Sequence, residues 1–479
     1  MASPTARPES QKSVVALMLA LIAAIFAFQL NASMLSPALA TMERELGATA
    51  AQIGVTQTAF FAAAALFSLF LPRWGDIIGR RKVLVGMLSV TTIGCVISAL
   101  APGVGVLGLG RIVQGVAGPV VPMTLIMLHV QVPDNRRYAK LMAVLTSLNG
   151  GIAGVDALAG GWLAQNFGFR AVFWTMAAVG ALAVVAILVG TVESKAPEQV
   201  TMDWKGTFLL VVVLAGLYFA FDQAGKLREA NWALVAGLLV VAAVAFVVFW
   251  KTEQRVAHPL VTTTYLRQRR TWALLSTTLL TMTGVFAVMN GLVPNLAQDS
   301  SVGTALRADE VSFWTLTPYA LAGLVMGPIA GQLAARFGFK RLLQAGLLLT
   351  IAGLGYAAWI VTSSTHVELL VLSIWVGITY AGIGNIMLNG LGIVLSPADN
   401  QGYLPGMNAG AFNLGAGLSF AILFGINTFV SETGGAVAGY RSAILGGAIL
   451  LVLALLTSTL IPPVPASRQD TADEPLPAA

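Results

Sequence analysis

The chain has 479 residues, of which 57% are hydrophobic and only 10% are charged. A soluble globular protein carries roughly 25% charged residues, so these charges cannot give so long a chain a solvated surface. The composition excludes a disordered chain and a soluble multidomain enzyme, and it predicts a protein whose outer surface faces lipid. The single cysteine, Cys95, lies in an apolar run and excludes a disulfide framework or a cysteine-based metal site.

Fourteen apolar runs are long enough to cross a bilayer, which takes about 20 residues. The first run is longer than the apolar core of a signal peptide and contains Gln29 and Asn31, so we interpret it as a retained span. We therefore expect an all-α membrane protein with 14 transmembrane helices. The runs cover residues 14–38, 51–72, 83–101, 105–131, 139–165, 171–191, 206–222, 232–250, 271–297, 311–335, 342–362, 367–395, 406–430 and 441–462.

The basic residues gather on one side of these predicted spans. If both termini are cytoplasmic, the cytoplasmic segments hold 20 of the 27 Lys and Arg residues and the outer segments hold six. This is the positive-inside bias of membrane proteins, and it explains the net charge of +6 without a nucleic-acid partner. The remaining one, Arg111, falls in the interior of a span.

Two turns recur at nearly one offset. Asp134-Asn135 after the fourth span matches Asp399-Asn400 after the twelfth, 265 residues later, and Gly79 after the second span matches Gly338 after the tenth, 259 residues later. This indicates two six-helix bundles with pseudo-two-fold symmetry and two inserted helices, the pattern of secondary transporters with a substrate site between the halves. The expected division is 1–191 for the first bundle, 192–270 for the linker with the extra helices, 271–463 for the second bundle and 464–479 for a disordered tail.

The turn after the second span carries a charged motif. Gly79 allows a tight turn there, and Asp76 can accept hydrogen bonds from Arg80 or from helix N-terminal amides. With Arg81, these residues form a predicted conformational latch at the inner face. The alternative is that the turn is only a positive-inside anchor.

One polar layer is expected in the first bundle. Arg111 lies 24 residues before the turn at residue 135 and Asp156 lies 21 after it, so their depths differ by about 5 Å. A buried Arg needs a partner, and Asp156 is the carboxylate that the next span offers. Asn31 and Gln57 reach a similar depth.

Asp156 has two interpretations. In the first it is the coupling proton site, which releases and rebinds H⁺ as access alternates. In the second it is a permanent counter-ion to Arg111, because a neighbouring guanidinium favours the ionised carboxylate. We expect protons as the coupling ion, with no cofactor and no metal.

The second bundle offers amides and aromatic side chains that suit amphiphilic organic substrates. The alternative for each is a lipid-interface belt or a bond between helices. The predicted substrate cavity comprises Asn31, Gln57, Gln114, Asn290, Tyr319, Trp375, Tyr380 and Asn385.

These motifs resemble those of the major facilitator superfamily, specifically its 14-span drug:proton antiporter branch, over almost the whole chain. Asp76, Gly79, Arg80 and Arg81 match the superfamily's G-x-L-a-D-r-x-G-R-R loop, with Pro72 in place of its first glycine. A second match lies in the fourth span, where Arg111, Gln114 and Gly115 resemble the R-x-x-Q-G motif that is associated with proton coupling.

The chain departs from that branch at two points. The first span reads Leu30-Asn31-Ala32-Ser33 where the branch has L-D-x-T, and the fifth span has Asp156-Ala157 in place of the Gly-Pro pair, although Gly160 and Gly161 match. Compared with the branch, the first span lacks an acidic residue at Asn31 and the fifth span has an additional one at Asp156. These departures weaken the inference of a lipophilic-cation preference and of the export direction.

The leading expectation is a proton-coupled secondary transporter that exports small amphiphilic compounds by alternating access, as a multidrug efflux antiporter does. The alternative is uptake of a specific small organic solute by proton symport. A non-transporting membrane sensor or scaffold is a third possibility. The sequence has no G-x-x-x-x-G-K-[ST] loop and no facing cluster of His or acids, so neither a primary pump nor an enzyme is expected. The resemblance implies a location in a bacterial inner membrane. We expect a monomer with a small-molecule substrate, and the positive-inside bias predicts that both termini are cytoplasmic.

Overall fold

The computed structural model describes residues 14–132, 134–194, 202–224, 230–256, 259–397 and 403–463, and these ranges contain helices and no β-strand. The predicted tail at 464–479 lies outside the described residues, as does part of the predicted linker. The helices of the first half are α1 (Val14–Ser33), η1 (Ser36–Ala38), α2 (Leu39–Leu46), α3 (Ala50–Ile78), α4 (Arg80–Ala99), α5 (Val104–Gln114), η2 (Gly115–Ala117), α6 (Val120–Gln131), α7 (Asn135–Phe167) and α8 (Phe169–Gly190).

The inserted segment and the second half are equally helical. The inserted helices are α9 (Trp204–Ala224) and α10 (Trp232–Glu253), followed by the short α11 (Thr263–Leu266). The second half contains α12 (Arg269–Ala287), η4 (Val288–Leu292), α13 (Val293–Gln298), α14 (Ala308–Val311), η5 (Ser312–Leu316), α15 (Thr317–Phe337), α16 (Phe339–Trp359), η6 (Ile360–Thr362), α17 (His366–Val376), η7 (Gly377–Gly384), α18 (Asn385–Val394), α19 (Tyr403–Ser419), η8 (Phe420–Phe424) and α20 (Gly425–Thr459).

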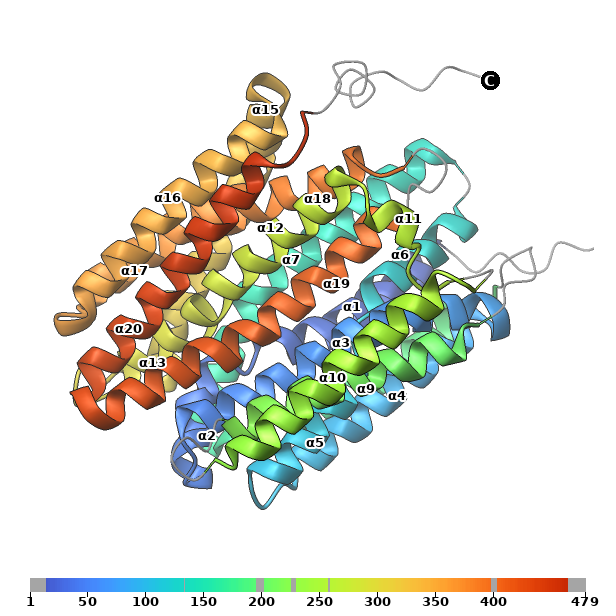
Figure 1. The fold of residues 1–479 in the computed structure, drawn as a ribbon. Helices are drawn as coiled ribbons and strands as arrows, with labels where there is room; N and C mark the ends of the chain where they lie inside the picture. Colours follow the sequence, from blue (N-terminus) through green and yellow to red (C-terminus); the bar gives the residue numbers. More distant parts are fainter. Residues whose placement is uncertain are drawn as a thin grey trace, which may run out of the picture.

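The long helices lie side by side in one elongated bundle (Figure 1). Helices of the second half, such as α15, α16, α17 and α20, gather on one side, and α3, α4 and α5 lie on the other. The inserted helices α9 and α10 pack against each other, and α9 packs against α3. Large apolar side chains of α10, including Val240 at 61% exposure, face outward, as expected of a helix in contact with lipid.

Twelve helical segments of the described chain are long and apolar enough to cross a membrane. The prediction of 14 transmembrane helices is not supported by this count. Helix α7, with 33 residues, is not among the twelve. Residues Tyr403–Thr459 count as a single segment of 57 residues, although Gly435 within it has the non-helical φ of 80°.

The two predicted repeat glycines have the same backbone role. Gly79 ends α3 and precedes α4 with φ 124°, and Gly338 ends α15 and precedes α16 with φ 85°. A positive φ favours glycine, which has no Cβ to clash. The helix that follows each pair is also interrupted at a similar place. The turn η2 at Gly115 separates α5 from α6, and η7, which begins at Gly377, separates α17 from α18.

Close approach of helices explains part of the high glycine content. A Cβ atom on Gly115 would lie 2.4 Å from Cβ of Ala63, and one on Gly118 would lie 2.3 Å from the carbonyl oxygen of Ala64. Only glycine therefore lets the η2 turn cross α3 at this distance, as small residues do at many helix contacts in membranes.

The two halves are joined by hydrogen bonds toward the end of the molecule that carries α2. Oγ1 of Thr58 on α3 donates to the carbonyl of Gly417 at 2.8 Å, and Oγ1 of Thr317 donates to the carbonyl of Gly154 at 2.7 Å. The halves are thus closed on one another at the α2 end.

Candidate functional site

Arg111, at the end of α5, is fully buried and ties three helices of the first half together. Its Nη1 donates to Oε1 of Gln114 at 2.6 Å, and its Nη2 donates to Oε1 of Gln57 on α3 at 2.9 Å. Both nitrogens also donate to the backbone carbonyl of Asn31 on α1 at 3.2 Å. The planar guanidinium suits this arrangement because its donors form a rigid fork.

The surroundings of Arg111 are polar but uncharged. The Phe60 ring lies 4.2 Å from its guanidinium carbon, a cation–π contact. Gln114 is itself fixed, since its Nε2 donates to the carbonyl of Gly94 at 3.0 Å and to Ser98 Oγ at 2.7 Å. Two buried donors of this layer, Nε of Arg111 and Nε2 of Gln57, have no hydrogen-bond partner among the described residues.

Asp156, on α7, is buried with 2% exposure, and it does not contact Arg111. Its Oδ2 accepts a hydrogen bond of 2.5 Å from Oγ of Ser33, and its Oδ1 has no partner within the described ranges. The predicted ion pair between Asp156 and Arg111 is therefore wrong for this conformation. Two residues at the same depth in the membrane can point in different directions around their helix axes. Asp156 faces Ser33 in the last turn of α1, whereas Arg111 donates to the Asn31 carbonyl of the same helix.

The contact between Asp156 and Ser33 relates the two departures from the family motifs. Ser33 occupies the last position of Leu30-Asn31-Ala32-Ser33, two residues beyond the place where the branch has its acid. The Asp156 carboxylate on α7 thus lies against the first-span motif, in which Asn31 replaces the acid of the branch. Ser33 was not among the predicted site residues, because only the tertiary contact distinguishes it from other small polar residues. Gln29 Nε2 donates to Ser33 Oγ at 3.0 Å and extends the chain of hydrogen bonds.

The turn between α3 and α4 brings its predicted residues together. Nε of Arg80 donates to Oδ1 of Asp76 at 2.8 Å. The structure adds Glu193, which follows α8: its carboxylate accepts from the backbone N–H of Arg81 at 3.0 Å and of Lys82 at 3.2 Å. Glu193 therefore caps the N-terminus of α4, where unpaired N–H groups favour an anion. The sequence shows that Glu193 lies just beyond an apolar span, which makes it a candidate cap. It does not show which helix this residue caps.

The predicted residues of the second half fall into separate environments. Tyr380 is 3% exposed, and its hydroxyl contacts Sδ of Met282 on α12 at 2.6 Å. Asn385 accepts a hydrogen bond from Asn389 Nδ2 at 3.1 Å. Trp375 lies against α16 instead, because its Nε1 donates to the carbonyl of Leu349 at 2.9 Å and its side chain is 37% exposed. The structure thus does not bring Trp375 together with Tyr380.

Two further predicted residues, Asn290 and Tyr319, are both half-buried. Asn290 lies in the η4 turn, where its Nδ2 donates to the carbonyl of Phe286 at 3.0 Å. Tyr319 lies on α15, and its backbone packs closely against Gly377 at the start of η7.

A contact that the sequence did not predict joins the halves at the α2 end. Oε1 of Glu43 on α2 accepts from Nδ2 of Asn295 on α13 at 2.6 Å. Next to it, Nε2 of Gln298 donates to the backbone carbonyl of Pro37 at 3.2 Å. These bonds hold the two halves together at this end, and they must separate for the halves to open there.

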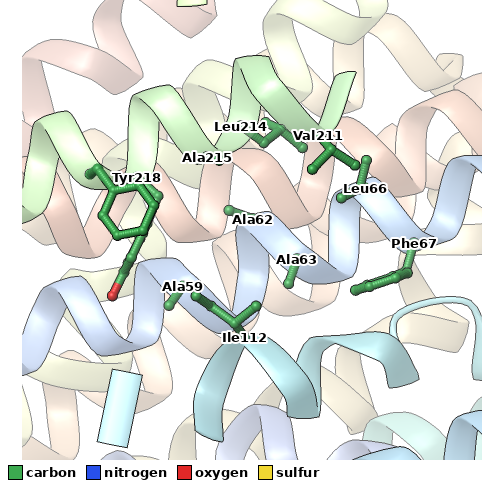
Figure 2. Close-up of a pocket in the computed structure, with 11 residues that line it drawn as sticks. Ala59, Ala62, Ala63, Leu66, Phe67, Ile112, Val211, Leu214, Ala215 and Tyr218 are labelled. Carbon is green, nitrogen blue, oxygen red and sulfur yellow. The ribbon is translucent and has the colours of Figure 1, made fainter. Parts of the chain in front are cut away.

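An apolar pocket of about 220 Å³ lies between α3, α5 and α9 (Figure 2). Its lining contains none of the predicted substrate residues and no charged or amide side chain, so it does not suit a polar substrate. No group of three or more His, Cys, Asp or Glu side chains in the described residues is placed to hold a metal ion. The pocket is lined by Ala59, Ala62, Ala63, Leu66, Phe67, Ile112, Val211, Leu214, Ala215, Tyr218 and Phe219.

The fold and the site define an integral membrane transporter. It has two groups of spanning helices joined across an interface, helix pairs broken at equivalent places, and a buried polar network inside the first group. Residues 21–420 match the family model described as Major Facilitator Superfamily, and the chain belongs to that family.

Comparison with individual proteins supports the same class. The chain is 58% identical over 464 residues to a uridine/deoxyuridine transporter of Lactococcus lactis subsp. cremoris, covering 96% of this chain and 97% of that protein. It is 23% identical to the multidrug resistance protein Stp of Mycobacterium tuberculosis, covering 83% of this chain and 73% of that one.

Among solved structures, a variant of the nucleoside transporter NupG covers 93% of this chain and 99% of its own, with a TM-score of 0.65 and 14% identity. A POT family transporter in complex with 5-aminolevulinic acid covers 93% of this chain and 96% of its own, with a TM-score of 0.66 and 15% identity. At these identities the likeness shows the fold alone. The relatives and structural neighbours are transporters, and the chain is a transporter rather than an enzyme.

Proposed function

We propose that this protein takes up a pyrimidine nucleoside of the uridine and deoxyuridine type by proton symport. The observation that carries the proposal is the 58% identity, over 96% of the chain, to a transporter of these nucleosides. The multidrug relative shares only 23% of its residues. The findings therefore favour uptake of a specific solute, the second of the two expectations, over drug efflux.

The site agrees with a neutral substrate. A carboxylate that is exposed in a cavity without a partner would favour binding of a lipophilic cation. Here Asp156 is 2% exposed and accepts a hydrogen bond from Ser33. Export of small amphiphilic compounds stays the second candidate, and the similarity to a multidrug resistance protein supports it.

Asp156 is the proposed proton-coupling residue. Its Oδ1 is buried without a partner, a condition that protonation relieves because a neutral carboxyl costs less to bury than a carboxylate. Arg111 has the proposed role of keeping α1, α3 and α5 in register through its fork of hydrogen bonds. The proposed substrate cavity lies between the halves and draws on Asn31, Gln57, Gln114, Asn290, Tyr319, Tyr380 and Asn385.

Alternating access would proceed by rocking of two six-helix bundles, residues 1–191 and 271–463, with α9 and α10 in the linker 192–270. Two features support 14 crossings: α7 has 33 residues, and Gly435 breaks the 57-residue segment into two parts that are each long enough to span. The positive-inside bias places both termini in the cytoplasm of a bacterial cell. The α2 end is then external, and the hydrogen bonds between the halves there close this conformation toward the outside.

In that orientation the α3–α4 turn lies at the inner face. The proposed latch there comprises Asp76, Gly79, Arg80 and Arg81, to which Glu193 adds its cap of α4. We propose that these contacts stabilise one arrangement of the first bundle and that the protein acts as a monomer.

The test is radiolabelled uridine transport into proteoliposomes with an imposed pH gradient, read together with proton movement. The expected result is accumulation of uridine on the side to which protons flow, at a rate at least tenfold above empty liposomes. Movement of uridine against the proton flow would indicate antiport. Absence of uridine transport, combined with transport of cationic dyes, would favour the efflux function.

A further inference from the structure

A cluster of phenylalanine rings crosses the interface between the two halves. Phe61 comes from α3, and its ring centroid lies 5.2 Å from that of Phe286 on α12, at an interplanar angle of 85°. The same ring lies 6.4 Å from Phe420 of η8, with planes only 9° apart. Phe286 is also 6.2 Å from Phe412 on α19. These four rings are called the phenylalanine cluster below.

The cluster adjoins the polar layer of Arg111. Phe61 lies one turn of α3 beyond Gln57, whose Oε1 accepts from Arg111, and residues four apart share a helix face. Phe60 lies beneath the guanidinium itself. An aromatic surface and the polar network of the first half are therefore consecutive along one helix.

Two amides flank the phenylalanine cluster and have unused hydrogen-bonding capacity. Asn413 follows Phe412 directly and is 8% exposed, yet its side chain has no hydrogen-bond partner among the described residues. Asn290 lies one turn after Phe286 and donates only to that residue's carbonyl, so its Oδ1 is free within the same ranges. None of these unused amide atoms is among the fully enclosed polar atoms without a partner, so they are open to a ligand.

Irregular helix geometry coincides with the same place. The π-helical turns η4 (Val288–Leu292) and η8 (Phe420–Phe424) both border the cluster. A Cβ on Gly291 in η4 would lie 2.7 Å from the ring of Phe424, so the turn also needs a glycine there. Single π turns within helices occur frequently at functional sites.

We infer that the phenylalanine cluster is the nucleobase subsite, with the pyrimidine ring stacked on Phe286 and Phe412 and its edge bound by the amides of Asn290 and Asn413. This rests on the proposed transport of pyrimidine nucleosides. Uracil presents a carbonyl, an N–H and a second carbonyl along one edge, and an amide supplies both a donor and an acceptor to such an edge. Phe286 and Phe412 are half-buried, whereas Phe61 and Phe420 are only 2% exposed, so the first two rings offer the accessible surface of the cluster.

The inference predicts a preference for a planar, aromatic base. Stacking of a base on an aromatic side chain contributes about 1–3 kcal/mol, which corresponds to roughly a five- to 150-fold change in affinity. The wild-type protein should therefore bind uridine at least fivefold more tightly than 5,6-dihydrouridine, whose ring is neither planar nor aromatic. Phe286→Leu and Phe412→Leu should reduce this ratio of affinities toward one. Phe286→Tyr, which keeps an aromatic ring, should retain the wild-type ratio.

The experiment measures competition by both compounds against radiolabelled uridine in proteoliposomes. Because the readout is a ratio from one preparation, partial loss of folded protein does not change it. Phe313→Leu is the matched control, since that ring is 59% exposed on η5 and lies outside the cluster. An unchanged ratio in Phe286→Leu and Phe412→Leu, with uridine transport intact in the wild type, would overturn the subsite. Absence of uridine binding by the wild type would overturn the proposed function together with it.

A second measurement tests the amides. Asn413→Ala should reduce the preference for uridine over 3-methyluridine, which lacks the N–H of the base edge, by about tenfold. Asn408 provides the control, because its amide is already used: Oδ1 accepts from Thr278 at 2.6 Å and Nδ2 donates to the Leu388 carbonyl at 3.3 Å. An Asn413→Ala variant with the wild-type preference would exclude this residue from the subsite.

Discussion

The hydroxyl of Ser33 donates a 2.5 Å hydrogen bond to Oδ2 of Asp156 and so joins the last turn of α1 to α7. Arg111 donates to the carbonyl of Asn31, two residues away on α1. The cation and the carboxylate therefore lie on either side of one helix turn without touching. Movement of that turn would change the environment of both groups, which is the property that a proton-coupled transporter requires.

Asp156→Asn should abolish the movement of protons that accompanies uridine, because an amide cannot exchange a proton at this site. Exchange of labelled for unlabelled uridine, which needs no net proton transfer, should continue. The measurement is pH-gradient-driven uptake beside counterflow, with the exposed Glu45→Gln as control. Normal proton movement in Asp156→Asn would remove this residue from the coupling mechanism.

Ser33→Ala should weaken coupling less severely, since the carboxyl group stays but loses the donor to its Oδ2. We expect gradient-driven uptake to fall several-fold while counterflow is retained. Ser33→Thr keeps the hydroxyl and should behave as the wild type. Equal loss of both kinds of transport in Ser33→Ala would point to a packing defect instead.

Arg111→Lys should destabilise the first half by about 2 kcal/mol, because a single ammonium cannot reproduce the fork that binds Asn31, Gln57 and Gln114. Thermal unfolding of the purified protein in detergent checks this. Arg307→Lys is the matched control, as that residue pairs with Asp309 at an exposed site where ion pairs contribute little. Equal melting temperatures for the two variants would contradict the structural role of the fork.

Gly79→Ala should destabilise the α3–α4 turn by about 1–3 kcal/mol. The φ of 124° is unfavourable for alanine, and the new Cβ would lie 2.6 Å from the carboxylate of Glu193. Gly86→Ala, inside α4 with nothing within 4 Å of its added Cβ, should instead be neutral or stabilising. The measurements are the unfolding midpoint and the uptake rate of each variant. Equal midpoints and rates for Gly79→Ala and Gly86→Ala would show that the turn does not require glycine.

The 14-crossing arrangement predicts the side on which single cysteines react. In a Cys95→Ser background, Asn166→Cys in the last turn of α7 and Thr433→Cys near Gly435 should react with an impermeant maleimide added outside the cell. Asp134→Cys, before α7, should react only from the cytoplasm. All three positions are exposed. External labelling of Asp134→Cys, or protection of the other two, would refute the proposed topology.

The sequence by itself determined the helical membrane class and the family, because long apolar runs and short charged turns follow from local composition. It also predicted the helix-connecting glycines Gly79 and Gly338, which share a positive φ, while the repeat inferred from them stays a prediction. Such features are local, since a turn or a span is formed by residues that are neighbours in the chain.

The tertiary structure alone decided which side chains meet. Arg111 and Asp156 were predicted at one depth, but rotation about each helix axis directs them to different parts of α1. The rings of Phe61 and Phe286 are more than 200 residues apart and meet only because the two halves pack on one another. Rotation and packing depend on all neighbouring helices at once, so no short stretch of sequence encodes them.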